Sequence, residues 1–391
     1  MARFAGGLGM RWSPTFTLHL RSLEVRPLEI LRPQRALLES SFYVRNLWLI
    51  ILASLLASSD FAQSNKKFDP DAGYTPVVAP SDKNDKKNKA EETQVLALPP
   101  ELPNAVVAET DRLAFHVAPL SAKGLLSQQT REALKHLLRE SHGTIVKLRA
   151  FVAGSGDLRR VGDITGEMFQ EKHLPLPALT VLQVGALPLQ GAQVAIEATD
   201  LDRKAVNPQG VAFVNAQPAA SVAESIEKIK SLLASGGMEP SDALLVTCFV
   251  SSLDEQRDAG QAMSSMFHGA ALDYVQMQRA PVTPPAACEA VARASKPGSS
   301  AQVVITGVQL AFGNQDKDLT LAFDRLEKTL AEKGASLDRA VVSHLYVTDG
   351  SLASRVLALG HAAGTRSIIP VEGLPSLDSS FGTDVIAEKH D

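Results

Sequence analysis

The sequence has little of what marks several common classes of protein. Its 391 residues include only two cysteines, Cys248 and Cys288, which cannot form a disulfide framework. The 39 lysine and arginine residues are outnumbered by 43 aspartate and glutamate residues, which argues against a nucleic-acid surface. The chain shows neither the clustered His and Cys spacing of zinc sites nor a glycine-rich phosphate loop. We therefore expect no metal, no other cofactor and no nucleic-acid partner.

Long apolar runs are also scarce near the start of the chain. Leu47 to Ala57 reads LWLIILASLLA, which is shorter than the roughly 20 residues that span a bilayer. It fits the apolar core of a secretory signal, and a membrane span is not expected after removal of the signal. The preceding residues contain arginines and no lysine. We interpret 1–62 as an extension and signal whose true start lies near Val44 or Leu47, with an organellar transit peptide as the alternative.

Residues 63–99 form the next region and include the run DKNDKKNKAEE. This polar stretch lacks apolar periodicity and is interpreted as a solvated linker. With the signal before it, the linker favours a periplasmic or secreted protein.

The remainder of the chain is self-similar, which indicates a repeat architecture. Large apolar residues recur 98 positions apart: Phe115, Phe151, Met168 and Phe169 match Phe213, Phe249, Met266 and Phe267. Tyr346 follows Phe249 by 97 positions and marks a third copy. We predict repeats at 100–200, 201–297 and 298–391.

Each repeat has the same predicted order of elements, β-α-β-α-β-β. The helices show apolar residues at spacings of three and four, and Ser221 with Glu224 predicts a capping box. Two helices on one face of a sheet predict an α+β fold. Strands such as Val303 to Leu310 are apolar almost throughout, which indicates that a neighbouring repeat covers the second face. We predict a monomeric, intramolecular pseudo-trimer, which does within one chain what a homotrimer does with three.

The last two strands of each repeat flank a proline and carry the candidate site residues. An acid follows each proline, namely Glu197, Glu289 and Asp384. Arg366 lies nine residues before the last proline, where the other repeats have Leu179 and Leu272. If these strands pair as a hairpin, Arg366 and Asp384 face each other at roughly 5 Å and line a small pocket. The alternative is an ion pair on a solvated hairpin.

Several motifs carry a family resemblance. SIEKIKSLLASGGMEPSDALLVTCFVSSLDE in the second repeat, and LEKTLAEKGASLDRAVVSHLYVTD with RSIIPVEGLPSLD in the third, resemble the RidA (YjgF-type) family of enamine/imine deaminases. The similarity covers 105–387. It implies a chorismate-mutase-like fold, with clefts between neighbouring units and no cofactor.

The resemblance also implies residue roles. In that family an arginine binds the substrate carboxylate and a glutamate places the attacking water. Carried over, Arg366 binds substrate, and Asp384, Glu197 and Glu289 are the catalytic acids. Leucine cannot offer a forked donor to a carboxylate, so two of the three clefts are expected to be altered.

Other polar residues are interpreted as structural. His116, His344 and His361 are scattered and are expected on the surface or half-buried. Cys248 and Cys288 both fall on predicted strands, where two buried thiols are favoured and a single disulfide is the alternative.

Two functions remain open. The first is an exported hydrolase of imines or related C–N bonds in small carboxylate-bearing molecules. The second is a non-catalytic protein that binds such molecules in clefts between repeats. A ribonuclease activity is disfavoured by the acidic balance and the expected export.

Overall fold

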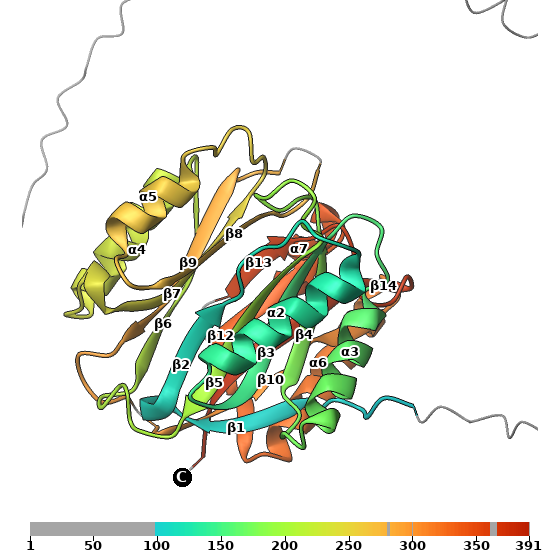
Figure 1. Cartoon of the computed structure of the whole chain (residues 1–391), viewed down its shortest axis with the longest axis horizontal. Coiled ribbons are helices and arrows are strands. Elements are labelled where there is room, and N and C mark those ends of the chain that lie inside the picture. The colour runs from blue at the N-terminus through green and yellow to red at the C-terminus, as the bar shows by residue number, and fades with distance from the viewer. Residues whose placement is uncertain (1–97, 280–281, 299, 360–365, 391) are drawn as a thin grey trace, which may run out of the picture. The chain divides into compact units, whose positions relative to one another are not determined.

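Strands and helices build three separate β-sheets, with the helices packed on their outer faces (Figure 1). The computed structural model describes residues 98–279, 282–298, 300–359 and 366–390, which belong to the compact unit Glu92–Asp391. The extension and signal predicted for 1–62 lie outside the described residues, as does the linker up to residue 97. Among the described residues, no helix is long and apolar enough to cross a membrane. The fold is mixed α+β, as the sequence predicted.

The first sheet has the strand order β2-β5-β3-β4. Its strand β5 runs antiparallel to both β2 and β3, while β4 is parallel to β3. Two helices bury apolar residues such as Leu134 and Ile164 against its outer face. The elements are β2 (Leu113–Val117), α2 (Leu126–Glu140), β3 (Gly143–Ala153), α3 (Arg159–Glu171), β4 (Ala178–Val184) and β5 (Val194–Asp202).

The second sheet repeats this strand order as β6-β9-β7-β8. Helix α4 begins where the sequence predicted, because the Ser221 hydroxyl accepts a hydrogen bond from the backbone N–H of Glu224. The Glu224 carboxylate accepts from the Ala220 N–H instead of that of Ser221, so the predicted box is one-sided. The elements are β6 (Val211–Ala219), α4 (Val222–Ser235), η2 (Pro240–Asp242), β7 (Ala243–Val250), α5 (Ala259–Met266), β8 (Ala271–Gln276) and β9 (Ala286–Arg293).

The third sheet follows the same path, β10-β14-β12-β13, with β11 also paired to β14. One strand joins it from elsewhere: β1 (Ala105–Glu109) pairs antiparallel with β10, although the sequence placed it in the first repeat. A short 3-10 helix, η1 (Thr110–Arg112), then leads to β2. The other elements are β10 (Gln302–Thr306), β11 (Gln309–Phe312), α6 (Asp316–Ala331), β12 (Ala335–Val347), α7 (Gly350–Ala358), β13 (Arg366–Pro370) and β14 (Ser379–Lys389).

The predicted hairpin at the end of the chain is wrong. Strand β13 pairs parallel with β12, and β14 pairs antiparallel with the other side of β12. A helix connects β12 to β13, and such a crossover returns the chain parallel to the strand it left. Arg366 therefore lies beside Ser343, whereas Asp384 lies beside His344.

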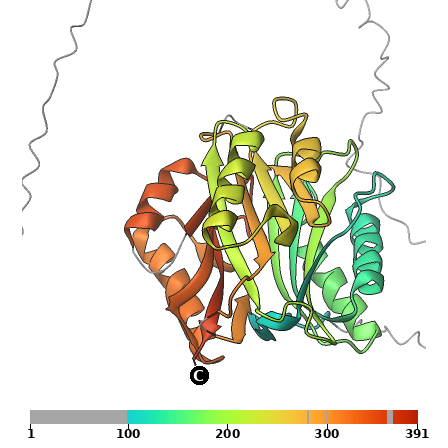
Figure 2. The ribbon, with the colours of Figure 1, turned by 90° about the vertical axis from the view of Figure 1, so that its left-hand side faces the viewer.

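The three sheets contact one another in a cycle. Strand β2 packs against β7 and β8, β6 packs against β12 and β13, and β10 packs against β3 and β4. Figure 2 shows the helix pairs on different sides of the molecule, with the strands between them. The central strands of the three sheets are β3, β7 and β12. They contribute Phe151, Phe249 and Tyr346 to one inner apolar cluster, and all three side chains are fully buried. The inner sheet faces are thus buried by neighbouring sheets, which explains the nearly continuous apolar strands.

Candidate functional site

A polar layer crosses the interior at one level of the three sheets. Each central strand carries a polar residue there, and each lies opposite an acid on the neighbouring antiparallel strand. The cross-strand pairs are Arg149 with Glu197, Thr247 with Glu289, and His344 with Asp384. Because side chains alternate across a strand, the neighbouring aromatic residues two positions further on also point inward.

Arg149 joins the first and second sheets. Its Nε donates to Glu197 at 2.6 Å, and its Nη1 donates to Glu289 at 2.6 Å. Its Nη2 donates to the Thr247 hydroxyl at 3.2 Å, and that hydroxyl donates to Glu197 at 2.5 Å. Burial opposes the charge, but Glu197 and Glu289 outweigh it and raise the pKa of Arg149. These bonds use three of the five N–H groups of a guanidinium, and the Tyr346 hydroxyl is a further hydrogen-bonding neighbour of Arg149.

His344 joins the second and third sheets. Its Nδ1 is 2.8 Å from Asp384, and its Nε2 is 3.1 Å from Glu289. Burial alone lowers the pKa of an imidazole, but Glu289 and Asp384 outweigh burial and raise the pKa of His344 to about 9. The ring is therefore an imidazolium at neutral pH, and both nitrogens donate hydrogen bonds.

Lys147 joins the first and third sheets. Its ammonium donates to Asp384 at 3.0 Å and to the Thr180 hydroxyl at 2.6 Å. The Thr306 carbonyl accepts its third hydrogen bond, and Thr180 also donates to Asp384. All three donors of the ammonium are therefore used within the protein.

The acids of the layer and the neighbouring Asp273, which is the register partner of Thr247, differ in charge state. Burial raises the pKa of a carboxyl, but Arg149 and then His344 outweigh it and lower the pKa of Glu289 to about 2. Lys147 and His344 likewise hold the pKa of Asp384 far below its usual range. Asp273, on β8, shows the reverse: burial, with Glu197 nearby, raises its pKa to about 8. Asp273 is therefore mostly protonated at neutral pH, and its Oδ2 has no hydrogen-bond partner among the described residues.

A cavity of about 80 Å³ lies against this layer. Lys147, Arg149, His344 and the three acids line its polar part, and apolar side chains that include Phe115 and Phe213 line the remainder. Phe151 and Phe249 close the polar layer from the other side, because the Arg149 guanidinium lies 5.2 Å and 5.7 Å from their ring centroids. The volume suffices for several waters or a small ligand.

The structure brings together three of the four predicted site residues. Glu197, Glu289 and Asp384 are buried and meet at one cavity, where the sequence predicted three separate clefts. Arg366 is not among the residues that line this cavity, and its Nη1 donates to the Leu357 carbonyl at 3.2 Å. The physical reason is the parallel placement of β13 beside β12, away from β14.

Sequence reasoning missed the basic members of the site. Lys147 and Arg149 lie in VKLRAFVAG, whose pattern indicates only a strand. The sequence presents His344 as one of several scattered histidines, yet it lies at the centre of the layer. His116 is half-buried 3.2 Å from Asp200, and His361 lies outside the described residues. Aligning the sequences of the three central strands would have singled out these residues, because Arg149 and His344 then fall at equivalent positions, each two residues before a buried aromatic side chain.

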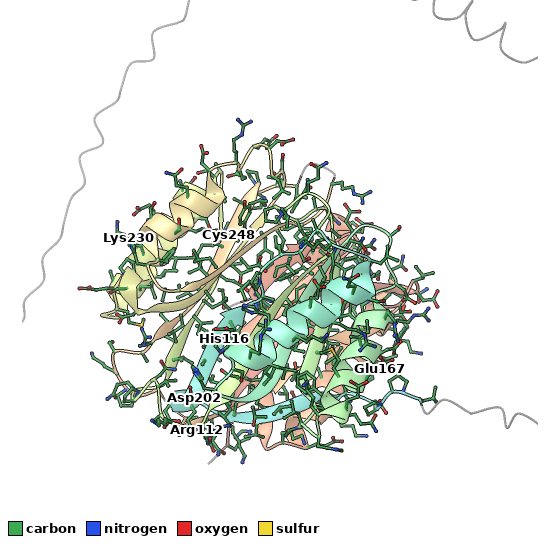
Figure 3. The ribbon with its side chains drawn as sticks, viewed as in Figure 1. Arg112, His116, Glu167, Asp202, Lys230 and Cys248 are labelled. Atoms are coloured by element: carbon green, nitrogen blue, oxygen red, sulfur yellow. A yellow bond between two sulfur atoms is a disulfide. The ribbon has the colours of Figure 1, made fainter. Side chains whose placement is uncertain are left out.

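The two cysteines are bonded, which corrects the expectation of two free thiols. Cys248 on β7 and Cys288 on β9 are register partners and form a disulfide with an S–S distance of 2.05 Å (Figure 3). Both are fully buried beneath α4. Each is adjacent in sequence to a member of the polar layer, Thr247 or Glu289. No group of His, Cys, Asp and Glu among the described residues has the arrangement of a metal site.

The fold and site define a mixed α+β protein with a buried acid–base cluster beside a small cavity. No protein-family profile matches the chain, and no curated protein matches it. Yeast Mmf1 is 22% identical over 22% of this chain and 80% of its own, with a TM-score of 0.21.

Two further solved structures can be compared. Rv2704 of the YjgF/YER057c/UK114 family, from Mycobacterium tuberculosis, is 24% identical over 22% of this chain and 78% of its own, with a TM-score of 0.21. A chorismatase is 9% identical over 74% of this chain and 99% of its own, with a TM-score of 0.23. At these TM-scores the similarity assigns this chain neither a family nor an activity.

Proposed function

We propose that the chain is a RidA-like protein that hydrolyses the carbon–nitrogen bond of imines, enamines or related groups in small carboxylate-bearing molecules. One observation carries the proposal. The imidazolium of His344 is held between Glu289 and Asp384 at the wall of a cavity, with Arg149 beside it. This combination offers a proton donor, water-orienting acids and a cation in one enclosed place.

We further propose that residues 100–200, 201–297 and 298–391 are three diverged copies of one unit, arranged as a pseudo-trimer. The shared strand order of the three sheets and their cyclic contacts support this proposal. So does the layer itself, since Arg149, Thr247 and His344 occupy equivalent places opposite the three acids. One cluster that joins all three copies replaces the separate clefts that the sequence suggested.

The chemistry follows from the charge states. The C=N carbon of an imine is electrophilic, and protonation of its nitrogen makes it more so. His344 is charged at neutral pH and can donate that proton, because its pKa is about 9. Glu289 or Asp384 accepts a hydrogen bond from the attacking water and orients it, while the Arg149 guanidinium holds the substrate carboxylate. Water adds to carbon, the C–N bond breaks, and the products are a ketone and ammonia.

An assay with a freshly formed imine tests the proposal. An amino-acid oxidase generates the imino acid in situ, and the whole protein should accelerate release of ammonia. The variant His344→Gln should lose about 100-fold or more of the rate, which is the usual contribution of general acid catalysis. Arg366→Ala is the matched control, because that side chain does not line the cavity, and it should retain the rate. Absence of acceleration by the wild-type protein would refute the proposal.

A non-catalytic binding protein is the second candidate. The observation that favours it is the internal balance of the layer: Lys147, Arg149 and His344 are already paired with the three acids. Such a buried network is also what a purely structural cluster looks like. A rise in melting temperature with a small carboxylate, without any turnover of imines, would favour this candidate.

Export is proposed on two grounds. The apolar run within residues 1–62 fits a secretory signal, and the disulfide between Cys248 and Cys288 is typical of oxidising compartments. Fractionation of the source cells, followed by N-terminal sequencing of the protein, tests this proposal. Recovery from the cytosol with residue 1 intact would contradict it.

A further inference from the structure

Asn215 differs from the other polar residues of the cavity wall. It lines the cavity and is only 6% exposed, yet neither Nδ2 nor Oδ1 has a hydrogen-bond partner among the described residues. A buried carboxamide without partners is unfavourable, because it has lost its bonds to water and gained none in return. Such a group points to a ligand that supplies the missing bonds.

The backbone places Asn215 there by a break in strand pairing. Val214 pairs with Ala290, and the next pair is Gln217 with Cys288, so two residues of β6 lie opposite Glu289 alone. This is a β-bulge, a feature that redirects a side chain and is common beside active sites. The bulge is fixed on both sides. The backbone carbonyl of Asn215 accepts a hydrogen bond from Gln217 Nε2 at 2.8 Å. The backbone N–H of Ala216 donates to the Ser367 hydroxyl at 2.9 Å.

The other two sheets differ from the second sheet at the equivalent place in their strand pairing. In the third sheet, pairing is interrupted after β10, and Thr306 satisfies its own hydroxyl there through the Val385 N–H at 2.9 Å. In the first sheet, β2 pairs with β5 without a break. Of the three sheets, only the second has an unpaired amide at its break, as far as the described residues show.

We propose that Asn215 recognises the ligand of this cavity, and that it takes a group with a hydrogen-bond donor and an acceptor side by side. A carboxamide is such a group, as is a protonated carboxyl, since the asparagine side chain offers both an N–H donor and a carbonyl acceptor. The ligand carries this group on an apolar body that packs against Phe115 and Phe213. This inference rests on the proposed small-molecule site and names the chemistry that the site selects.

The charged layer supports this choice of ligand. Lys147, Arg149 and His344 are paired with three carboxylates, so a carboxylate of the ligand can bind only through the N–H groups of Arg149 that this pairing leaves over. Asn215 carries an unpaired donor and an unpaired acceptor that are themselves buried, so a ligand reaches them when the carboxamide turns into the cavity that the residue lines. Recognition of the uncharged end of a ligand therefore falls to Asn215.

Calorimetric titration of the whole protein with three probes tests the proposal. Benzamide, benzoate and toluene share an apolar ring and differ in the polar group, which is a donor with an acceptor, acceptors alone, or nothing. Benzamide should bind at least about tenfold more tightly than toluene, as expected for two hydrogen bonds to a buried partner. Benzoate cannot donate to the Asn215 Oδ1, so its affinity should depend on Arg149 and not on Asn215.

Two variants localise the effect. Asn215→Leu keeps the shape and removes the amide, so benzamide should lose its advantage while the melting temperature of the free protein holds or rises. Asn207→Ala is the control: Asn207 is also buried and its Oδ1 also lacks a partner among the described residues, but its Nδ2 donates to the Leu113 carbonyl and it does not line the cavity. It should lower the melting temperature and keep the preference for benzamide.

Failure of this inference is distinct from failure of the proposed function. If wild-type protein binds benzamide no better than toluene, the role of Asn215 is refuted, whether or not the variants fold. If Asn215→Leu retains the preference, the role is also refuted. The imine assay is independent, so a preference for benzamide without turnover would refute only the hydrolase.

Discussion

His344 and Glu289 belong to strands of different sheets, yet the imidazole Nε2 lies 3.1 Å from a carboxylate oxygen of Glu289. The other carboxylate oxygen of Glu289 accepts a hydrogen bond at 2.6 Å from Arg149, which belongs to the first sheet. Glu289 therefore joins side chains from all three sheets. Because the members are buried or nearly so and share hydrogen bonds, disturbing one of them should affect stability and chemistry together.

Removal of Arg149 should destabilise the protein strongly. Arg149→Met leaves Glu197 and Glu289 buried without their main cation, and breaking a buried pair in this way costs about 3–5 kcal/mol. Arg131→Met is the control, since its partner Glu167 is partly exposed and such a pair contributes about 1 kcal/mol or less. Urea unfolding measures both variants. Equal, small losses would show that the layer does not support the fold.

Stability should fall on the alkaline side because of His344. Its pKa is about 9 in the folded protein, against 6.5 for an unperturbed histidine, so the folded state holds its proton more tightly. This contribution is fully present below pH 6.5 and is lost as the pH rises through 9, and it amounts to roughly 3 kcal/mol. Unfolding free energies measured from about pH 6 to about pH 10 should show the decline, and His344→Gln should remove much of it.

Asp273 should contribute to the pH dependence at lower pH. Its folded pKa is raised from 3.8 to about 8, so folding is favoured by its proton, and the benefit is lost as the pH rises through 8. Asp273→Asn should therefore stabilise the protein above about pH 8 relative to wild type and change little near about pH 4. Thermal melts across this range provide the measurement. Asp254→Asn, at an exposed position outside the layer, serves as the control; a similar gain there would contradict the role of burial.

The disulfide should stabilise the second sheet. Cys248 and Cys288 are 40 residues apart in sequence, and a loop of this length is usually stabilised by about 2–4 kcal/mol when it is closed. The double variant Cys248→Ala, Cys288→Ala should lose about this much in urea unfolding. Dithiothreitol should lower the stability of wild type and leave the variant unchanged. Stability of wild type that is unaffected by reduction of the bond would contradict the prediction.

The order of elements could be predicted because it depends on local patterns. Apolar spacing defined the helices, and recurrent landmarks such as Phe151 and Phe249 placed the strands. Strand pairing could not be predicted so well, because it depends on contacts distant in sequence. The turn at Pro375 suggested a hairpin, whereas α7 carries β13 to the parallel side of β12.

The sequence predicted the acidic residues of the site but not the basic ones. The three acids were found by their recurrence after a turn, and the structure brings them together. Their partners could not be found by recurrence, because Arg149, Thr247 and His344 differ in kind at one equivalent position. Arg366 drew attention because it matched the resemblance, but the pairing of β13 places it away from this cavity.

The charge of His344 decides whether the polar layer can supply a proton to a substrate. Imidazole nitrogen shifts, followed by NMR on histidine-labelled whole protein and assigned with His344→Gln, report its protonation as the pH is varied. We predict that His344 stays protonated with both nitrogens hydrogen-bonded through neutral pH and titrates at about 9. A neutral imidazole at about pH 7, titrating at or below 6.5, would contradict it.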